Sequence, residues 1–154
     1  MSEDMIEQYI KDQYTATAVS LSKSYGFVVS DIGKVIDLFR SVRHEKMGRL
    51  LSLGSGDGRV ENIAARLFGF NVIGIELSPQ LVQIARDHTE ALDEVVQHTG
   101  IKTKDGTIEF VTGNYFPIHF RKKVQADGLT TFIEGHDPYT NFKIADFDFV
   151  YVYP

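Results

Sequence analysis

Cysteine is absent from this sequence of 154 residues, and so are long apolar runs. Without cysteine there is no disulfide framework, no cysteine metal cluster and no thiol nucleophile. No apolar run approaches the roughly 20 residues that span a bilayer, and residues 1–4 are acidic where a signal peptide is basic. Together these absences predict a cytoplasmic protein without a membrane partner.

The sequence also has fewer basic than acidic residues, which gives a formal net charge of −5. Such a balance gives no general attraction to nucleic-acid phosphates and favours small-molecule or basic protein substrates. The histidines have no metal-ligand spacing, so we expect no metal site. The length suits a single domain over residues 1–154, and a hydrophobic content of 43% is enough to bury a core.

Glycine is concentrated directly after a short apolar strand at residues 50–53. Gly54, Gly56 and Gly58 stand there at every second position. Glycine adopts positive φ angles and has no Cβ, so a small molecule can lie against the main-chain amides. An apolar stripe at helical spacing follows, at Val60, Ile63, Ala64, Leu67 and Phe68. The pattern predicts a strand, a ligand-binding loop and the N-terminus of a helix.

The next predicted strand, residues 71–76, ends at Glu76, 22 positions after Gly54. In a doubly wound sheet the carboxyl end of this strand lies beside the first loop, where a carboxylate can accept both hydroxyls of a ribose. A dinucleotide fingerprint would need glycine or alanine at the position of Arg59, and a P-loop would need Gly-Lys-Ser/Thr, which is absent. An NAD-dependent protein is therefore disfavoured. Arg59 itself could reach a carboxylate or lie on the exposed face of its helix.

Further elements of an α/β fold are predicted along the chain. Two helices are predicted in the helical segment 1–45, one at residues 4–20 and a second capped by Ser30. A long helix capped by Ser78 runs from Pro79 to Gly100. Two further strands are predicted, one at residues 107–112 and one at 147–153 that is buried on both faces. Residues 117–146 lack a helical stripe and are predicted to be an insertion. Within it, residues 118–124 and 129–134 could form a β-hairpin, with disorder as the alternative.

Three segments of the chain resemble class I S-adenosylmethionine-dependent methyltransferases. They are residues 53–59 in the glycine loop, 74–79 at the end of the second strand and 113–116 after the third. The likeness covers residues 25 to 154 and looks strongest toward the small protein-lysine methyltransferases. It implies a Rossmann-like doubly wound parallel sheet with strand order 3-2-1-4.

The same resemblance implies S-adenosyl-L-methionine as the cofactor. The glycine-loop backbone would carry its methionine part, with Asp57 on the ammonium group. Glu76 would hold the ribose hydroxyls, and Asn114 would bind the adenine amino group at a position where the family usually has Asp. The residues implied at the cofactor site are Tyr25, Gly54, Ser55, Gly56, Asp57, Gly58, Glu76, Leu77, Asn114 and Tyr115.

The acceptor side is marked less clearly. Tyr115, Tyr151 and Tyr153 are candidates for an acceptor channel, although aromatic residues in a buried strand are more often core. Family members that methylate nucleic-acid bases carry an Asp/Asn/Ser-Pro-Pro-aromatic motif after the fourth strand, where residues 152–154 here read Val-Tyr-Pro. The resemblance therefore implies N-methylation of a protein side chain such as lysine. The alternatives are a small-molecule methyltransferase and a non-catalytic nucleoside-binding or scaffolding half-domain.

The sequence stops at Pro154, on the fourth predicted strand. Members of the resembled family continue with further strands, so we expect a sheet that is truncated after strand four. An aromatic edge at residues 147–153 would favour pairing with another chain. The expected outcomes are a homodimer through this edge, a separate partner chain or a truncated molecule.

Overall fold

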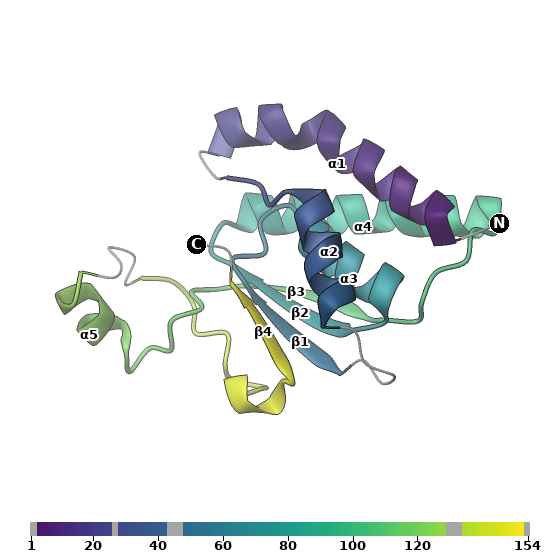
Figure 1. Cartoon of the computed structure of the whole chain (residues 1–154). Helices are drawn as coiled ribbons and strands as arrows, with labels where there is room; N and C mark the ends of the chain where they lie inside the picture. The colour runs from purple at the N-terminus through teal and green to yellow at the C-terminus, as the bar shows by residue number, and fades with distance from the viewer. Residues whose placement is uncertain (1–2, 26–27, 43–47, 129–133, 153–154) are drawn as a thin grey trace.

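Four parallel strands form one sheet, in the order β3-β2-β1-β4 (Figure 1). They are β1 (Arg49–Leu53), β2 (Asn71–Glu76), β3 (Ile108–Thr112) and β4 (Phe149–Val152). This computed structural model describes residues 3–25, 28–42, 48–128 and 134–152. The strand order is the predicted one.

β1 is a central strand that pairs with β2 on one side and with β4 on the other. Leu51 lies opposite Ile73 of β2 and Val150 of β4. The chain moves in one direction from β1 to β3 and then returns past β1 to form β4. This reversal makes the carboxyl ends of β1 and β4 a topological switch point, which is where open α/β sheets bind their ligands.

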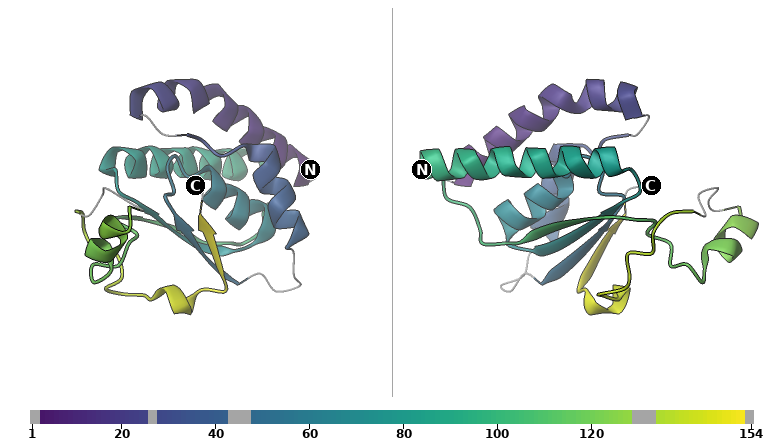
Figure 2. Two further views of the ribbon diagram at one scale, coloured as in Figure 1. Left: turned by 60° about the vertical axis from the view of Figure 1, so that its left-hand side comes forward. Right: turned by 180° about the vertical axis from the view of Figure 1, so that it is seen from behind.

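Four helices cover one face of the sheet (Figures 1 and 2). They are α1 (Glu3–Tyr25), α2 (Ile32–Ser41), α3 (Arg59–Phe68) and α4 (Pro79–Thr99). Their apolar stripes form one core with the inner face of β1 and β2, and Ile36, Ile63 and Leu92 are buried in it. None of the helices that the structure describes is both long and apolar enough to cross a membrane.

The two N-terminal helices differ from the prediction at their ends. α1 runs to Tyr25, beyond the predicted range. α2 is capped by Asp31, whose side chain accepts a hydrogen bond from the backbone N–H of Lys34 at 2.9 Å. The predicted cap, Ser30, instead shares a hydrogen bond of 3.2 Å with the hydroxyl of Tyr151. Either residue type suits a cap, so the distant contact with β4 decides between them.

The ends of α4 confirm the prediction. Ser78 Oγ accepts from the N–H of Leu81 at 3.3 Å, Pro79 is the first helical residue, and Gly100 closes the helix with a φ of +67°. A cap, a proline and a left-handed glycine mark helix ends through their own conformational preferences. The two ends of this helix are therefore defined by residues at the ends themselves.

The segment between β3 and β4 contains helix α5 (Arg121–Ala126) and the short 3-10 helix η1 (Ile144–Asp146). The predicted hairpin arm at residues 118–124 is therefore wrong, and most of the other arm lies outside the described residues. Arg121 explains the difference, because its buried guanidinium donates to the carbonyl oxygens of Phe116, Gly135 and His136. α5 stands away from the sheet (Figure 1).

β4 is shorter than predicted and is buried on one face only. Phe149 and Tyr151 pack against the core, whereas Val150 and Val152 are 46% and 51% exposed. The prediction of a strand buried on both faces is wrong, because α1 to α4 all lie over the opposite face of the sheet (Figure 2). β4 is an outer strand of the described sheet, and a homodimer through its edge stays a prediction.

Candidate functional site

The predicted ligand-binding residues gather where the strands end. The glycine loop follows β1, Glu76 ends β2, and Asn114 comes just after β3. Since the strands are parallel, these carboxyl ends lie at one edge of the sheet, where β4 places Val152 opposite Leu53. The structure thus brings three separate segments of the sequence to one edge of the sheet, beside the switch point.

The glycine loop, residues 54–58, is fastened to β2 by its backbone. The N–H groups of Gly54 and Ser55 both donate to the carbonyl oxygen of Ile75, at 2.9 and 3.0 Å. All three glycines of the loop have φ angles between +56° and +83°. Residues with a side chain rarely adopt this backbone conformation, so the loop requires glycine at each of these positions.

Two of the loop glycines have different surroundings. Among the described residues, a Cβ on Gly54 would meet only the ring of Tyr115, at 3.9 Å, so the backbone there is open to a ligand. A Cβ on Gly58 would lie 2.9 Å from Phe110 and 3.0 Å from the Cβ of Ala85. Gly54 therefore fits the predicted ligand-facing role, whereas Gly58 is needed for packing between α3, α4 and β3.

Glu76 is half-buried and oriented by backbone donors. Its Oε2 accepts from the N–H of Gly56 at 2.9 Å, and its Oε1 accepts from the N–H of Ser78 at 3.0 Å. An ionised carboxylate accepts about four hydrogen bonds, so the two ribose hydroxyls of a nucleoside fit its remaining capacity. The hydrogen bond to Gly56 also joins the glycine loop directly to this carboxylate.

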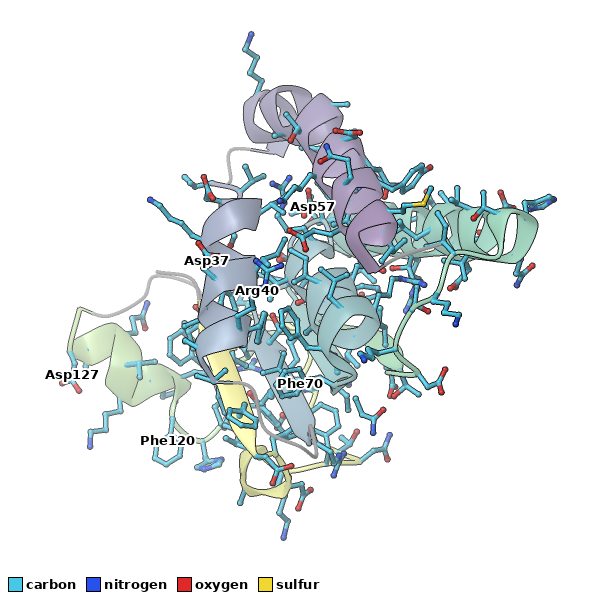
Figure 3. The ribbon with its side chains drawn as sticks, turned by 45° about the vertical axis from the view of Figure 1, so that its right-hand side comes forward. Asp37, Arg40, Asp57, Phe70, Phe120 and Asp127 are labelled. Carbon is cyan, nitrogen blue, oxygen red and sulfur yellow. The ribbon has the colours of Figure 1, made fainter. Side chains whose placement is uncertain are left out.

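Asp57 is buried and paired with Arg59. Figure 3 labels Asp57 in the region where α1, α2 and α3 meet. Arg59 Nη2 lies 2.7 Å from Asp57 Oδ2, and its Nε donates to Oδ1 at 3.0 Å. The sequence left two places open for Arg59, and the structure selects the carboxylate. A ligand ammonium would have to compete with this guanidinium for Asp57.

Arg59 also ties the loop to the N-terminal part of the chain. Its Nη1 donates to the carbonyl oxygen of Ser30 at 3.1 Å, and its Nη2 donates to that of Tyr14 at 3.4 Å. The guanidinium lies over the Tyr14 ring, 5.2 Å from its centroid. Sequence reasoning did not single out Tyr14, although its spacing of four residues from Ile10 places it on the buried stripe of α1.

The predicted adenine side of the site lies after β2 and β3. Asn114 is buried; its Oδ1 accepts from the N–H of Phe116 and its Nδ2 donates to the carbonyl oxygen of Glu134, both at 2.9 Å. An adenine amino group would therefore share the Asn114 oxygen with a backbone donor. Leu77 is exposed and Tyr115 is half-buried.

The other predicted tyrosines are only partly described. Tyr151 is half-buried, and together with Ser30 and Gly54 it lines a cavity of about 30 Å³ beside the glycine loop. Tyr153 lies outside the described residues, and so does the side chain of Tyr25 at the end of α1. Of the three acceptor-channel candidates, Tyr115 and Tyr151 therefore lie next to the loop.

Comparison with known families identifies the chain. The sequence model of the family described as histone methylation protein DOT1 matches residues 11–134, a range that includes the glycine loop, Glu76 and Asn114. The chain belongs to the DOT1 family. This membership and the strand order confirm the predicted Rossmann-like methyltransferase fold. No curated protein sequence matches the chain.

Solved structures similar to this DOT1-family chain include two methyltransferases in complex with S-adenosyl-L-homocysteine. The S-adenosylmethionine-dependent methyltransferase from Thiobacillus denitrificans is 27% identical, with a TM-score of 0.46 over 62% of this chain and 35% of that chain. The RNA methyltransferase from Salinibacter ruber is 25% identical, with a TM-score of 0.43 over 65% of this chain and 68% of that chain. The chain thus spans about a third of the first structure's length and about two thirds of the second's.

Proposed function

We propose that this DOT1-family chain binds S-adenosylmethionine at its glycine loop and takes part in methyl transfer to a protein side chain, with a lysine amine as the acceptor. The observation that carries the proposal is the hydrogen bond of 2.9 Å between the N–H of Gly56 and Glu76 Oε2. This hydrogen bond joins the loop, which is open to a ligand, to the carboxylate that would bind the ribose, beside the switch point of the sheet. The family match supports methylation as the reaction.

Each group of the site would have its own task. The backbone around Gly54 would carry the methionine part, Glu76 would accept the ribose hydroxyls, and Asn114 would receive the adenine amino group. When bound, S-adenosylmethionine supplies a methyl group already activated by its sulfonium. The chain's own contribution is to hold the acceptor in line with that methyl at about 3 to 3.5 Å and to exclude water.

A lysine acceptor must lose a proton before it attacks, because its ordinary pKa is about 10.4. Tyr139 is a poor base for this step, since burial raises its pKa to about 12 and its hydroxyl donates to the carbonyl oxygen of Tyr115 at 2.5 Å. Desolvation of the amine between aromatic rings such as those of Tyr115 and Tyr151 would favour its neutral form. We therefore propose that positioning and desolvation, rather than a dedicated base, prepare the acceptor.

Calorimetric titration of the chain with S-adenosylmethionine, S-adenosylhomocysteine and NAD tests the cofactor part of the proposal. We expect micromolar binding of the two adenosyl ligands and no heat of binding with NAD. Binding of NAD alone would overturn the assignment. Binding of none of the three would show that the loop and Glu76 do not make a cofactor site in this chain.

Glu76→Ala tests the ribose contact. The variant should weaken S-adenosylmethionine binding by about 1 to 3 kcal/mol, because the ribose hydroxyls lose their acceptor. Glu109→Ala, which removes an exposed carboxylate from the neighbouring strand β3, is the matched control and should bind normally. An affinity for Glu76→Ala equal to that of the control would refute the placement of the ribose.

Transfer of a labelled methyl group tests the acceptor. Purified chain and labelled S-adenosylmethionine are incubated with a lysine-containing histone peptide, with the same peptide carrying arginine in place of lysine, and with RNA. Labelling of the lysine peptide alone is the expected result, and labelling of RNA would contradict it. Cofactor binding without transfer to any acceptor would favour the alternative of a non-catalytic nucleoside-binding module.

A further inference from the structure

A second buried acidic group lies beneath the glycine loop and has no task in the proposed chemistry. Glu61, in the first turn of α3, has an exposed fraction of 0%. Ser52 of β1 and Ser55 of the loop are buried as well. Among the residues that the structure describes, the carboxyl oxygens of Glu61 and the hydroxyls of both serines have no hydrogen-bond partner.

Gly74 of β2 shows that Ser55 and Glu61 border the same small space above the sheet. A Cβ on Gly74 would lie 2.8 Å from the Cβ of Ser55 and 3.2 Å from both Cγ and Oε1 of Glu61. In the sheet, Gly74 is the register partner of Ser52. The Glu61 carboxyl therefore lies between α3 and the inner face of β1 and β2, directly under the loop.

The surroundings of Glu61 disfavour its ionised form. Burial raises the pKa of this carboxyl to about 8, and the carboxylates of Asp57 and Glu76 act in the same direction. The Ser52 hydroxyl is close enough to lower this pKa in part, although it lies outside the geometry of a hydrogen bond. A neutral carboxylic acid can donate one hydrogen bond and accept others.

No cation compensates for the charge of Glu61 in the described part of the chain. The Tyr14 phenol of α1 is close enough to this carboxyl for an electrostatic interaction, and burial raises the pKa of that phenol well above its ordinary value, so it stays neutral. The guanidinium of Arg59 is already paired with Asp57. Ionisation of Glu61 would therefore leave an unpaired charge in a buried site, which is strongly unfavourable.

We propose that Glu61 is a positioning residue of the cofactor site. Rotation of these side chains lets the neutral acid donate to one of the two serine hydroxyls and accept from the other, and so hold the base of the glycine loop against the sheet. Ser55 precedes Gly56 in the loop, and the N–H of Gly56 binds Glu76. A shift of Ser55 therefore moves the donor that orients the ribose carboxylate.

Ionisation of Glu61 removes its proton donor and adds repulsion from Asp57 and Glu76. The loop then loosens, and cofactor binding weakens as the pH rises. The ligand part of this inference rests on the proposed function. The response of the loop itself does not, because it needs no ligand.

Nuclear magnetic resonance of the ligand-free chain tests the loop. The amide signals of Ser55 and Gly56 are followed from about pH 6 to about pH 10 in the wild type, in Glu61→Gln and in Glu94→Gln, which removes an exposed carboxylate from α4. We expect a shared midpoint near about pH 8 in the wild type and in Glu94→Gln, and no such transition in Glu61→Gln. The same transition in all three proteins would overturn the proposal, and so would its absence from the wild type.

Binding of S-adenosylhomocysteine to the same proteins tests the link to the cofactor. Above the midpoint the wild-type affinity should fall by up to about tenfold per pH unit relative to Glu61→Gln; titration of the ligand itself cancels in this comparison. Glu61→Leu, which is neutral but cannot hydrogen-bond, should bind more weakly than Glu61→Gln at every pH, and equal affinity would overturn the hydrogen-bonding role. Failure of every variant to bind at any pH would refute the proposed function, while the amide titration would still decide the role of Glu61.

Discussion

The two sides of the glycine loop bury acidic groups in opposite ways. On the side of α1 and α2, Asp57 is paired with Arg59 across 2.7 Å. On the side of β2, Glu61 has no cationic partner in the described structure, and burial raises its pKa to about 8. The two acids are four positions apart in the chain, and each is at most 1% exposed.

The difference shows two physical solutions to one problem. A buried carboxyl must be paired with a cation or must keep its proton, because an isolated charge in a dry interior is too costly. The paired acid fastens the loop to the N-terminal helices, and the neutral acid fastens it to the sheet. The paired side should therefore lose stability when Arg59 is removed, and the side of Glu61 should lose stability when the pH rises.

Replacement of Arg59 by leucine should have the largest effect on stability, because it removes the partner of Asp57. The expected loss is about 3 to 5 kcal/mol of unfolding free energy, because Asp57 is left as an uncompensated buried charge. The carbonyl oxygens of Tyr14 and Ser30 also lose their donor. Urea denaturation at neutral pH measures the change.

The double variant Asp57→Asn/Arg59→Leu is the control for that loss. It contains neither buried charge, so it should recover part of the stability lost by the single variant. A double-mutant cycle then gives the coupling energy of the pair. Should the double variant be as unstable as Arg59→Leu, the arginine would act through packing rather than through its charge.

A neutral Glu61 should make the stability of the chain depend on pH. With a folded-state pKa of about 8 against an ordinary value of 4.5, the folded chain keeps a proton that the unfolded chain releases. The stability from this proton is complete below the ordinary value and is lost as the pH rises through the window up to about 8. Relative to Glu61→Gln, the wild type should lose up to about 1.4 kcal/mol per pH unit there. Parallel stability curves for the two proteins would contradict a neutral Glu61.

Local signals account for what could be predicted from the sequence. The glycine loop, the acidic end of β2 and the caps of α4 each depend on residues within a few positions, whose own conformational preferences define the structure. Gly54 and Glu76 were recognisable for this reason. The strand order came from the resemblance of these same motifs to a known family.

What the sequence did not reveal depends on contacts between distant residues. α5 forms where a hairpin was predicted, because Arg121 reaches carbonyl groups on both sides of it. Arg59 is buried only because α1 and the segment before α2 cover it. Glu61 looked ordinary, since acids are common in the first turn of a helix. Its burial becomes evident only when Gly74 is seen beneath it.

Gly74→Ala tests how tightly the neutral side is packed. The added methyl would approach the Cβ of Ser55 to 2.8 Å and Glu61 to 3.2 Å, so the loop or α3 must shift. We expect a loss of about 1 to 3 kcal/mol in unfolding free energy. Gly33→Ala is the control, because Gly33 is an exposed helical glycine and the same substitution should cause no loss of stability there. If Gly74→Ala were as stable as the wild type, there would be room under the loop and Glu61 would not be confined.

Tyr14→Phe has the smallest expected effect and distinguishes the role of the Asp57–Arg59 ion pair from that of the polar groups around it. Tyr14→Phe keeps the ring that lies under Arg59 and removes the hydroxyl that accepts from Asn62 Nδ2 at 2.9 Å. Asn62 Nδ2 still has Gly58 and Thr89 as acceptors, so we expect a loss of about 1 kcal/mol in denaturant unfolding. Cofactor affinity should stay nearly unchanged, because the guanidinium and Asp57 are untouched. A loss of about tenfold or more in affinity would mean instead that the Tyr14 hydroxyl, rather than the ion pair, orders this side of the loop.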